Sequence, residues 1–423
     1  MPSASDWFDR FMPGIMRCRL DDLVLETPVQ GMPALSARLG VDIRIKREDL
    51  QPVFSFKLRG AYAKLKSLTT EEKERGVICA SAGNHAQGVA MAARHLGIDA
   101  VVVMPAITPD IKVNAVEKLG ARVIIHGDDF DTACERALEI AQQERLTFVH
   151  PYDDPEVITG QATLAVELFR QCSSPPEYLF ICIGGGGLAA GTAIVSKYLH
   201  PETKLIGVEA AESASMKAAV DAGGPVTLDQ IGHFAEGVAV KRTGDLTYKI
   251  CAELLDDIIT VDNDEICAAV QDVYEDTRAI AEPAGVLAIA GIKRYFTDRP
   301  GNNTRVAAIL SGANVNFARL RHIAERAAVG EESEALLGVT IPERPGSFLD
   351  FCRTVGLRGI TEFNYRYSDR SDAHIFVGIA LKGGMAEKSE IMDELNRRGL
   401  PVIDLSTNDM ARLHIRHMVG GRA

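Results

Sequence analysis

The hydrophobic positions between Val77 and Leu310 form short apolar runs separated by longer segments with helical spacing. The strand-like runs VICA, AVVVMP, RVIIHG and TFVHP alternate with amphipathic stretches in the first series. The alternation resumes after Pro155 through YLFICI, KLIGVEA, IITV and RVAAIL. Alternating strands and helices predict parallel sheets with helices on both faces. Two such series favour two lobes, with a ligand crevice at the carboxyl ends of their strands.

The pattern changes near residue 335. The small, acidic stretch AAVGEESEA is typical of a linker, which we expect over 326–335. The runs LLGVTIP, ITEFNYRY, HIFVGIAL and PVIDL then predict strands, with helices over PGSFLDFCRTV and EKSEIMDELNRRG. This β-α-β-β-α-β order is the ferredoxin-like arrangement, expected over 336–423. The two-lobed α/β domain is expected over 1–325, with the smaller lobe at about 60–155.

Composition and charge exclude several classes of protein. A chain of 423 residues is long enough for two or three folding units. Its net charge of -12 gives no support to a nucleic-acid partner. The apolar stretches fall short of the ~20 residues of a membrane span, and we expect no secretory signal. The eight cysteines include no C-x-x-C pair, which favours reduced thiols in a cytoplasmic protein.

The stretch SFKLRGA contains a candidate for covalent chemistry. Lys57 follows an aromatic residue in a segment of low charge. Burial there would lower the pKa of the amine and leave it able to react with an aldehyde. A lysine that opens an amphipathic helix is often merely solvated, so this motif alone leaves both interpretations open.

The stretch SAGNHAQG follows strand VICA and opens a helix. Small residues at a helix N-terminus leave backbone N–H groups and a positive dipole end, which suit a carboxylate. The alternative is an ordinary capped turn, with Ser81 or Asn84 as the cap.

Two further motifs follow predicted strands. The four glycines of GGGGL cost backbone entropy that a plain turn does not require, which favours close approach to a phosphate. The same segment satisfies G-x-G-x-x-A through Gly184, Gly186 and Ala189, with Glu209 ending the next strand, so a dinucleotide site competes on local evidence. The stretch SGAN, taken singly, predicts only a turn.

Taken together, these four motifs are more specific than any one of them. SFKLRGA, SAGNHAQG, GGGGL and SGAN occur in this order, each at a strand end or a helix start. The set resembles the signature of fold-type II pyridoxal phosphate (PLP) enzymes, with a tryptophan synthase β-like fold, in the threonine and serine dehydratase branch. The resemblance covers about Asp21 to Arg326. It decides against the dinucleotide site, which accounts for one motif of the four.

The resemblance implies roles for individual residues, with Lys57 and Ser81 as the catalytic ones. Lys57 is implied to form the internal aldimine and later to act as the base at Cα. The implied cofactor-binding residues are Phe56, Lys57, Asn84, Gly184, Gly185, Gly186, Gly187, Leu188, Gly237 and Ser311. Phe56 is implied to lie against the ring, Asn84 to bind the 3'-oxygen, the glycine segment to hold the phosphate, and Ser311 to meet the ring nitrogen. The implied substrate-carboxylate site comprises Ser81, Ala82, Gly83, Asn84 and His85.

The hydroxyl of Ser311 has a chemical consequence under this interpretation. A carboxylate in its place would hold the ring nitrogen protonated and stabilise a carbanion, whereas a neutral hydroxyl favours elimination over transamination. Some similar enzymes carry a divalent metal after the strand that ends at the equivalent of Glu209. The second acidic residue expected near position 215 is absent here, so we expect no metal site.

The C-terminal segment carries no recognisable catalytic cluster. IPERPGSFLDF and FNYRYSD resemble the ACT-like regulatory domain of biosynthetic threonine dehydratases, present here as a single unit. The turn Pro345-Gly346-Ser347 is the expected place for an amino-acid effector, which the resemblance names as isoleucine.

The leading hypothesis is a PLP-dependent threonine ammonia-lyase. It would convert L-threonine to 2-oxobutanoate and ammonia, the first step of isoleucine biosynthesis, under feedback control by the C-terminal domain. The resemblance also implies a homo-oligomer, a tetramer, in the cytoplasm. The alternatives are a catabolic serine/threonine dehydratase, a β-replacement enzyme or threonine synthase of the same fold, and a non-catalytic amino-acid sensor.

Overall fold

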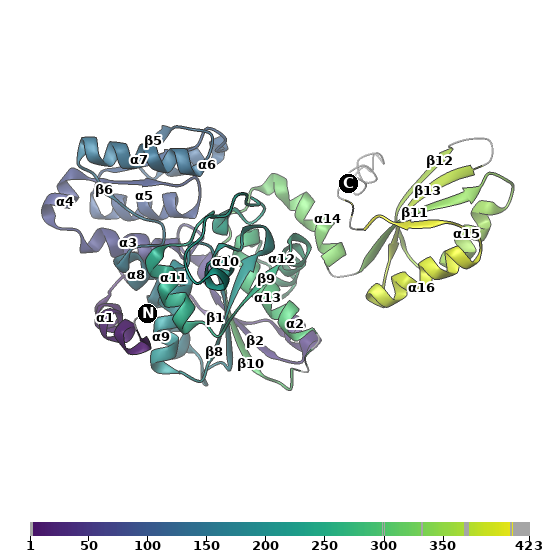
Figure 1. The fold of residues 1–423 in the computed structure, drawn as a ribbon, viewed down its shortest axis with the longest axis horizontal. Helices are drawn as coiled ribbons and strands as arrows, with labels where there is room; N and C mark the ends of the chain where they lie inside the picture. The colour runs from purple at the N-terminus through teal and green to yellow at the C-terminus, as the bar shows by residue number, and fades with distance from the viewer. Residues whose placement is uncertain are drawn as a thin grey trace. The chain divides into compact units, whose positions relative to one another are not determined.

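The computed structural model describes residues 3–297, 299, 301–330, 333–367, 372–406 and 408. It divides into two compact units, Met1–Leu320 and Arg321–Ala423 (Figure 1). The last part of the C-terminal domain expected from the sequence, 409–423, lies outside the described residues. Within the described chain, no helix is long and apolar enough to cross a membrane.

The larger lobe of the first unit is built on a sheet with the strand order β1-β2-β10-β7-β8-β9. Its strands are β1 (Val29–Gly31), β2 (Asp42–Arg47), β7 (Tyr178–Cys182), β8 (Lys204–Ala210), β9 (Asp257–Val261) and β10 (Arg305–Leu310). Each pair is parallel except β1 with β2. The apolar runs YLFICI and RVAAIL form the centre of this sheet because it is buried on both faces.

Helices cover both faces of this sheet. They are α1 (Ala4–Arg17), α2 (Pro33–Leu39), α8 (Pro155–Gln171), α9 (Gly187–Leu199), α10 (Ser215–Ala222), α11 (Asp245–Leu254), α12 (Asn263–Thr277) and α13 (Leu287–Phe296). Figure 1 shows α2, α12 and α13 on one side of the sheet and α8, α9 and α11 on the other. Short 3-10 helices connect several elements: η1 (Glu48–Leu50), η2 (Ala211–Ser213), η3 (Glu236–Val238), η4 (Pro283–Val286) and η5 (Phe317–Arg319).

The smaller lobe has a parallel sheet with the order β5-β4-β3-β6. Its elements are α3 (Lys57–Ser67), α4 (Thr70–Arg75), β3 (Val77–Ala80), α5 (Asn84–Leu96), β4 (Ala100–Met104), α6 (Asp110–Lys118), β5 (Arg122–Ile125), α7 (Phe130–Glu144) and β6 (Thr147–Phe148). Val77 and Cys79 of β3 pack with α3 and α5, whereas Ile78 and Ala80 pack with α7. The period-2 alternation of strand side chains thus gives two cores, one on each face.

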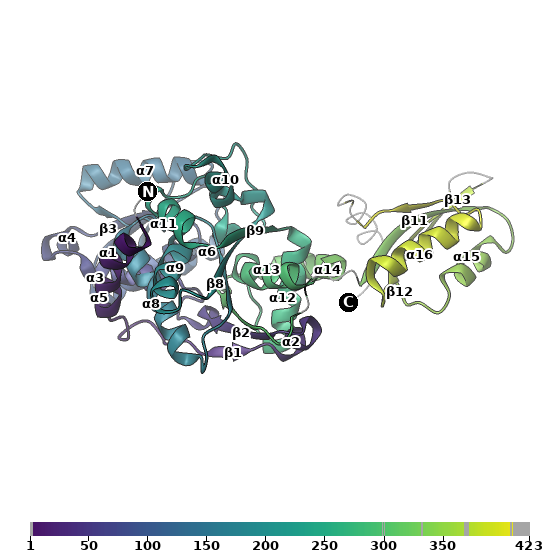
Figure 2. The same cartoon turned by 60° about the horizontal axis from the view of Figure 1, so that its bottom comes forward.

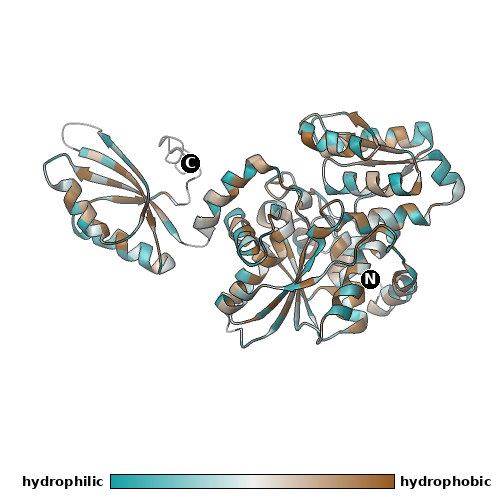
Figure 3. Ribbon diagram, turned by 180° about the vertical axis from the view of Figure 1, so that it is seen from behind, coloured by the Kyte–Doolittle hydropathy of each residue, from teal (hydrophilic) through white to brown (hydrophobic). Residues whose placement is uncertain are grey.

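The second unit confirms the predicted ferredoxin-like order. Its elements are β11 (Glu334–Pro342), α15 (Ser347–Val355), β12 (Ile360–Tyr367), β13 (Asp372–Ala380), α16 (Gly384–Arg397) and β14 (Val402–Asp404). The antiparallel sheet has the order β12-β13-β11-β14. Alternate residues of β11, including Leu337, Val339 and Ile341, pack with Phe351 of α15 and Leu395 of α16. Figure 2 shows both helices on one face of this sheet, and Figure 3 shows hydrophobic residues along its strands.

The first half of the segment expected to be a linker is helical in the structure. Helix α14 (Leu320–Gly330) includes the first residues of 326–335, and β11 begins at Glu334. Two of the small residues taken as a linker signal, Ala327 and Ala328, lie in this helix, and alanine has the highest helix propensity. The acidic Glu334 is likewise part of a buried strand and not of a solvated connection.

Candidate active site

A cavity of about 410 Å³, counting its open mouth, lies at the carboxyl ends of β7 and β10. Its lining residues are Phe56, Lys57, Asn84, Tyr152, Cys182, Gly184, Gly185, Gly186, Gly187, Leu188, Gly237, Val238, Glu282, Ala284 and Ser311. Helices α3, α5 and α9 all begin at this cavity. All ten residues expected to bind a cofactor are among the lining residues. Of the five expected to bind the substrate carboxylate, only Asn84 is.

Lys57 is the first residue of α3, and its amine faces the cavity. Its Nζ donates to the carbonyl oxygen of Pro151 at 3.4 Å and lies 5.3 Å from the centre of the Phe56 ring. Burial lowers the pKa of Lys57 to about 8, although nearby Cys182 and Glu282 act in the opposite direction. An appreciable fraction of this amine is therefore unprotonated near neutral pH, as reaction with an aldehyde requires.

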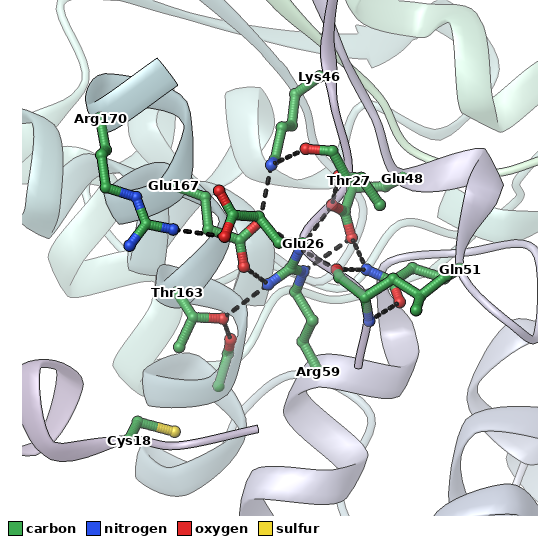
Figure 4. A network of polar contacts seen from close by, with 12 residues as sticks. Cys18, Glu26, Thr27, Lys46, Glu48, Gln51, Arg59, Thr163, Glu167 and Arg170 are labelled. Atoms are coloured by element: carbon green, nitrogen blue, oxygen red, sulfur yellow. Dashed lines mark hydrogen bonds and ion pairs between the residues drawn. The ribbon is translucent and has the colours of Figure 1, made fainter. Parts of the chain in front are cut away.

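The start of α3 is anchored by Arg59, two residues after Lys57. Figure 4 shows the Arg59 guanidinium between two carboxylates. Its Nε and Nη2 each donate to Glu48 at 2.8 Å, and its Nη1 and Nη2 donate to Glu167 at 2.6 and 2.8 Å. Lys46 also donates to Glu167, at 2.6 Å. The network thus ties α3 to η1, to β2 and to α8.

This network keeps buried charges ionised. Burial opposes the charge of Arg59, but Glu48 and Glu167 outweigh it and raise the Arg59 pKa. Burial likewise opposes the charge of Glu48, yet Arg59 and a hydrogen bond from Thr27 lower the pKa of that carboxyl below its ordinary value. Each buried charge therefore depends on its partner, because an isolated one would be strongly disfavoured.

The SAGNHAQG segment forms the turn into α5, and its Asn84 lines the cavity. Ser81, Ala82 and Gly83 are half-buried, and the Ser81 hydroxyl accepts from the N–H of Gly83 at 3.2 Å. His85 is buried, with Nε2 3.0 Å from the carbonyl oxygen of Val149. Burial lowers the pKa of His85 to about 3, so its ring is neutral. The His85 imidazole is therefore engaged by the Val149 carbonyl, and only the backbone of His85 is left to contact a ligand.

The glycine segment has no room for side chains. A Cβ at Gly185 would collide with Tyr152, one at Gly187 would be tightly packed against Tyr152 at 3.0 Å, and one at Gly186 would collide with Met216 and Thr247. Gly186 also has a φ of +94°, a conformation that L-residues rarely adopt. The hydroxyl of Thr247 donates to the Gly185 carbonyl at 2.6 Å and holds the loop from outside. The first N–H groups of α9 lack intrahelical acceptors and sit at the positive end of its dipole, which makes an anion site.

Ser311 directly follows β10 and faces the same cavity. Two backbone hydrogen bonds join the Ser311 segment to the lysine segment. Phe56 N–H donates to Ser311 O at 3.1 Å, and Ala313 N–H donates to Phe54 O at 2.9 Å. The Ser311 hydroxyl is 3.5 Å from the carbonyl oxygen of Ala284, a weak contact that leaves it able to bind a ligand atom. Burial raises the pKa of the neighbouring Cys182 thiol.

Two polar residues that line the cavity were not predicted from the sequence. Tyr152 follows β6, and its hydroxyl donates to the Arg242 carbonyl at 3.1 Å. Its place just after the predicted strand TFVHP was a usable signal, because the other motifs also follow strands. Glu282 precedes η4 and accepts from Asn84 Nδ2 at 2.6 Å, and burial raises its pKa to about 7. No sequence pattern pointed to Glu282.

Glu209 has a structural use in this fold. Its two carboxylate oxygens accept from the N–H groups of Met216 and Lys217 at 2.8 Å, so it caps α10. Burial raises its pKa to about 7. Within the described part of the chain, no group of three or more His, Cys, Asp or Glu residues could hold a metal ion. The eight cysteines are all described, and each is a free thiol.

The turn expected to bind an effector connects β11 to α15. Gly346 has a φ of +97° and precedes Ser347, the buried first residue of α15. The N–H of Asp350 donates to the Gly346 carbonyl at 3.0 Å, which closes the first helical turn.

Comparisons with known proteins agree with this arrangement. Residues 20–312 match the family "Pyridoxal-phosphate dependent enzyme", and residues 325–415 match the "C-terminal regulatory domain of Threonine dehydratase". The chain is 54% identical to the biosynthetic L-threonine dehydratase of Escherichia coli over 97% of this chain and 80% of that protein. It is 45% identical to the biosynthetic threonine dehydratase of Arabidopsis thaliana chloroplasts, over 98% of this chain and 70% of that protein.

A solved structure extends the similarity to three dimensions. The processed form of threonine deaminase isoform 2 from Solanum lycopersicum superposes with a TM-score of 0.75 at 45% identity, covering 76% of this chain and 94% of that one.

The cavity fits the cofactor that the family uses. Pyridoxal phosphate requires an amine for its aldehyde, an anion site for its phosphate and a partner for its ring nitrogen. Lys57, the glycine loop at the start of α9 and the Ser311 hydroxyl line one cavity and meet these needs. By sequence, fold and cavity, this chain belongs to the biosynthetic threonine dehydratases, a family of pyridoxal-phosphate-dependent ammonia-lyases.

Proposed function

We propose that this enzyme converts L-threonine to 2-oxobutanoate and ammonia, as the first step of isoleucine biosynthesis. The observation that carries the proposal is a lysine amine of lowered pKa in the same cavity as a glycine-lined anion site and a neutral hydroxyl. The identity of 54% with an enzyme named as a biosynthetic threonine dehydratase supports the substrate.

Each site residue has a proposed task. Pyridoxal phosphate, when bound, supplies the electron sink for the elimination. Lys57 binds the cofactor and carries a proton at Nζ, for which a pKa of about 8 is well suited. Phe56 lies against the ring and Gly237 runs past it, while the segment Gly184–Leu188 binds the phosphate. The turn Ser81–His85 binds the substrate carboxylate through its backbone N–H groups, with Ser81 also contributing its hydroxyl.

Ser311 favours elimination over competing reactions. Its neutral hydroxyl does not hold a proton on the ring nitrogen as a carboxylate would, so a long-lived carbanion is disfavoured. Loss of the β-hydroxyl must then closely follow removal of the Cα proton.

The second unit is proposed to bind an amino-acid effector, isoleucine, near Pro345, Gly346 and Ser347. Its match to the C-terminal regulatory domain of threonine dehydratase supports this role. We infer a catalytic domain over 1–325 and a regulatory domain over 336–423 in a cytoplasmic homotetramer.

The test is a keto-acid assay with threonine and with serine, each with and without isoleucine. We expect turnover of threonine to exceed that of serine, and isoleucine to raise the threonine concentration needed for half-maximal rate. A purified protein that binds pyridoxal phosphate but releases no keto acid from threonine would instead be an amino-acid sensor. Preferred turnover of serine, insensitive to isoleucine, would identify the catabolic type.

A further inference from the structure

The Asn84 amide is held by a protein group on each side. Its Nδ2 donates to Glu282 Oε1 at 2.6 Å, and its Oδ1 accepts from Asn314 Nδ2 at 2.6 Å. If the amide were turned by 180°, its oxygen would face a carboxylate and its nitrogen would face another NH₂ group. With Glu282 ionised, above about pH 7, both contacts would then be repulsive, so these partners select one of the two orientations.

The orientation of Asn314 is itself fixed by the backbone. The two N–H groups of its amide are donated to Asn84 Oδ1 and to the carbonyl oxygen of Val53, the latter at 2.8 Å. A backbone carbonyl can only accept hydrogen bonds, so Asn314 must present nitrogen to it. The Val53 carbonyl thus fixes the orientation of the Asn314 amide, and Asn314 in turn fixes that of Asn84.

Glu282 is held as firmly on the other side. Its carboxylate is buried, and a Cβ at Gly312 would collide with it. A Cβ at Gly237 would lie 3.9 Å from its Oε1. Its backbone N–H donates to the Gly312 carbonyl at 3.2 Å. The glycine of SGAN therefore makes the space in which this carboxylate reaches Asn84.

We propose that Glu282 and Asn314 are positioning residues that hold the Asn84 amide with its second N–H toward the cavity, where it donates to the 3'-oxygen of the cofactor. The inference rests on the proposed function, because it needs the cofactor in this cavity. Asn84 lines the cavity, and one of its two N–H groups is already donated to Glu282. Asn314 thus acts on the cofactor through Asn84, from outside the cavity lining.

The substitution Asn314→Asp tests this inference with almost no change in side-chain shape. An ionised carboxylate there faces two acceptors, Val53 O and Asn84 Oδ1, and donates to neither. Asn84 is then expected to turn its NH₂ group toward position 314 and away from the cavity. The matched control is Asn316→Asp, since Asn316 caps η5 through its Oδ1, an acceptor that aspartate retains. Glu282→Gln is the second variant, because it removes the charge that opposes the turned amide.

Two readouts are compared among the parent and the three variants. One is the dissociation constant for pyridoxal phosphate, measured by equilibrium dialysis of the stripped protein. The other is the visible absorption of the bound cofactor, which depends on ionisation of its 3'-oxygen, a state that a donated hydrogen bond favours. We expect Asn314→Asp to weaken cofactor binding on the order of tenfold and to shift the absorption to shorter wavelength, as for loss of one buried hydrogen bond. Glu282→Gln should shift it in the same direction, and Asn316→Asp should match the parent.

The outcomes separate this inference from the proposed function. Unchanged affinity and absorption in Asn314→Asp would overturn the positioning role while leaving the enzyme's activity as proposed. An Asn314→Asp protein whose unfolding midpoint falls while its cofactor absorption stays that of the parent would also overturn it, since the effect would then be on stability alone. A parent protein that takes up no pyridoxal phosphate would overturn both proposals.

Discussion

Burial moves the pKa of Lys57 down to about 8 and that of Glu209 and Glu282 up to about 7. In each case the low polarity around the group disfavours its charged form. The three groups nevertheless serve different ends. Lys57 gains reactivity, Glu209 caps a helix, and Glu282 orients an amide. Similar shifts therefore do not by themselves identify catalytic groups, and the partners of each side chain decide its use.

The pKa of Lys57 leads to a prediction for cofactor loading. The amine reacts in its unprotonated form, so the rate of covalent loading of the stripped protein should rise with pH and level off above about pH 8. Loading is followed by absorbance after mixing with pyridoxal phosphate between about pH 6 and 10. The control is Lys57→Ala, which should fold, load no cofactor at this site and release no keto acid. A rate that keeps rising to pH 10 would mean that this lysine has an ordinary pKa.

Glu209 leads to a prediction for stability. The folded protein holds its proton up to about pH 7, whereas the unfolded chain releases it near pH 4.5. The free energy of unfolding should therefore fall by roughly 3 kcal/mol from this group between these pH values, and not change further above them. Glu209→Gln removes the titration, so Tm of the parent minus Tm of the variant should decrease as the pH rises. A difference that stays constant or grows with pH would contradict the prediction.

Helices α3, α5 and α9 each supply their first turn to the cavity, and each start is fixed differently. Arg59 anchors α3 through Glu48 and Glu167, the Asn84 contacts hold α5, and Thr247 supports the loop before α9. Except for Glu48, the anchors come from elements far from the helices in sequence. The geometry of the site is thus a property of the packed lobes and not of the motifs alone.

The Arg59 network leads to a prediction for stability. Arg59→Met leaves Glu48 buried without its ion-pair partner and leaves Glu167 paired with Lys46 alone, which should cost about 3–5 kcal/mol of unfolding free energy. The control is Arg122→Met, which breaks an exposed ion pair with Glu144 and should cost about 0–1 kcal/mol. Denaturant unfolding of both variants gives the comparison. Equal losses would show that the buried network adds nothing beyond a surface pair.

The sequence predicted the elements better than the contacts between them. The apolar runs from Val77 to Leu310 predicted β3 to β10, but β1 and β2 of the larger sheet precede these runs and were not predicted. The sequence did not indicate that α14 continues into the first half of the predicted linker, because alanines occur in helices as well as in loops. Glu167 and Glu282 were missed because they lie far along the chain from the residues that they contact, 108 residues from Arg59 for Glu167 and 198 from Asn84 for Glu282. The roles of the ten cofactor residues stay predictions, although the structure brings them around one cavity.

The chain combines a catalytic unit with a unit that carries a regulatory family match. A regulatory unit can act only by binding one conformation of the enzyme better than another. The coupling free energy between two sites in such systems is typically ~1–3 kcal/mol, or about 5- to 150-fold in affinity. Regulation should therefore appear in the threonine concentration needed and not in the chemistry.

A truncated chain tests this division of tasks. A protein ending near Val329, within the last turn of α14, should keep threonine dehydration and lose inhibition by isoleucine. The measurement is the rate at several threonine concentrations with and without isoleucine, together with the molecular mass in solution. A truncated enzyme still inhibited at the same isoleucine concentration would move the effector site into the first unit.

The strand order of the larger sheet bears on how the chain is made in the cell. β10, at residues 305–310, lies between β2 and β7 and pairs with both. During synthesis from the N-terminus, β2 and β7 emerge long before the strand that joins them. The smaller lobe, with its strands between Val77 and Phe148, can fold meanwhile, but the larger sheet keeps two unpaired edges that invite aggregation. Because Ser311 follows β10 directly, the nascent chain completes its cofactor site only when β10 pairs with β2 and β7. Binding of chaperones to these two strands until then would protect their edges from aggregation.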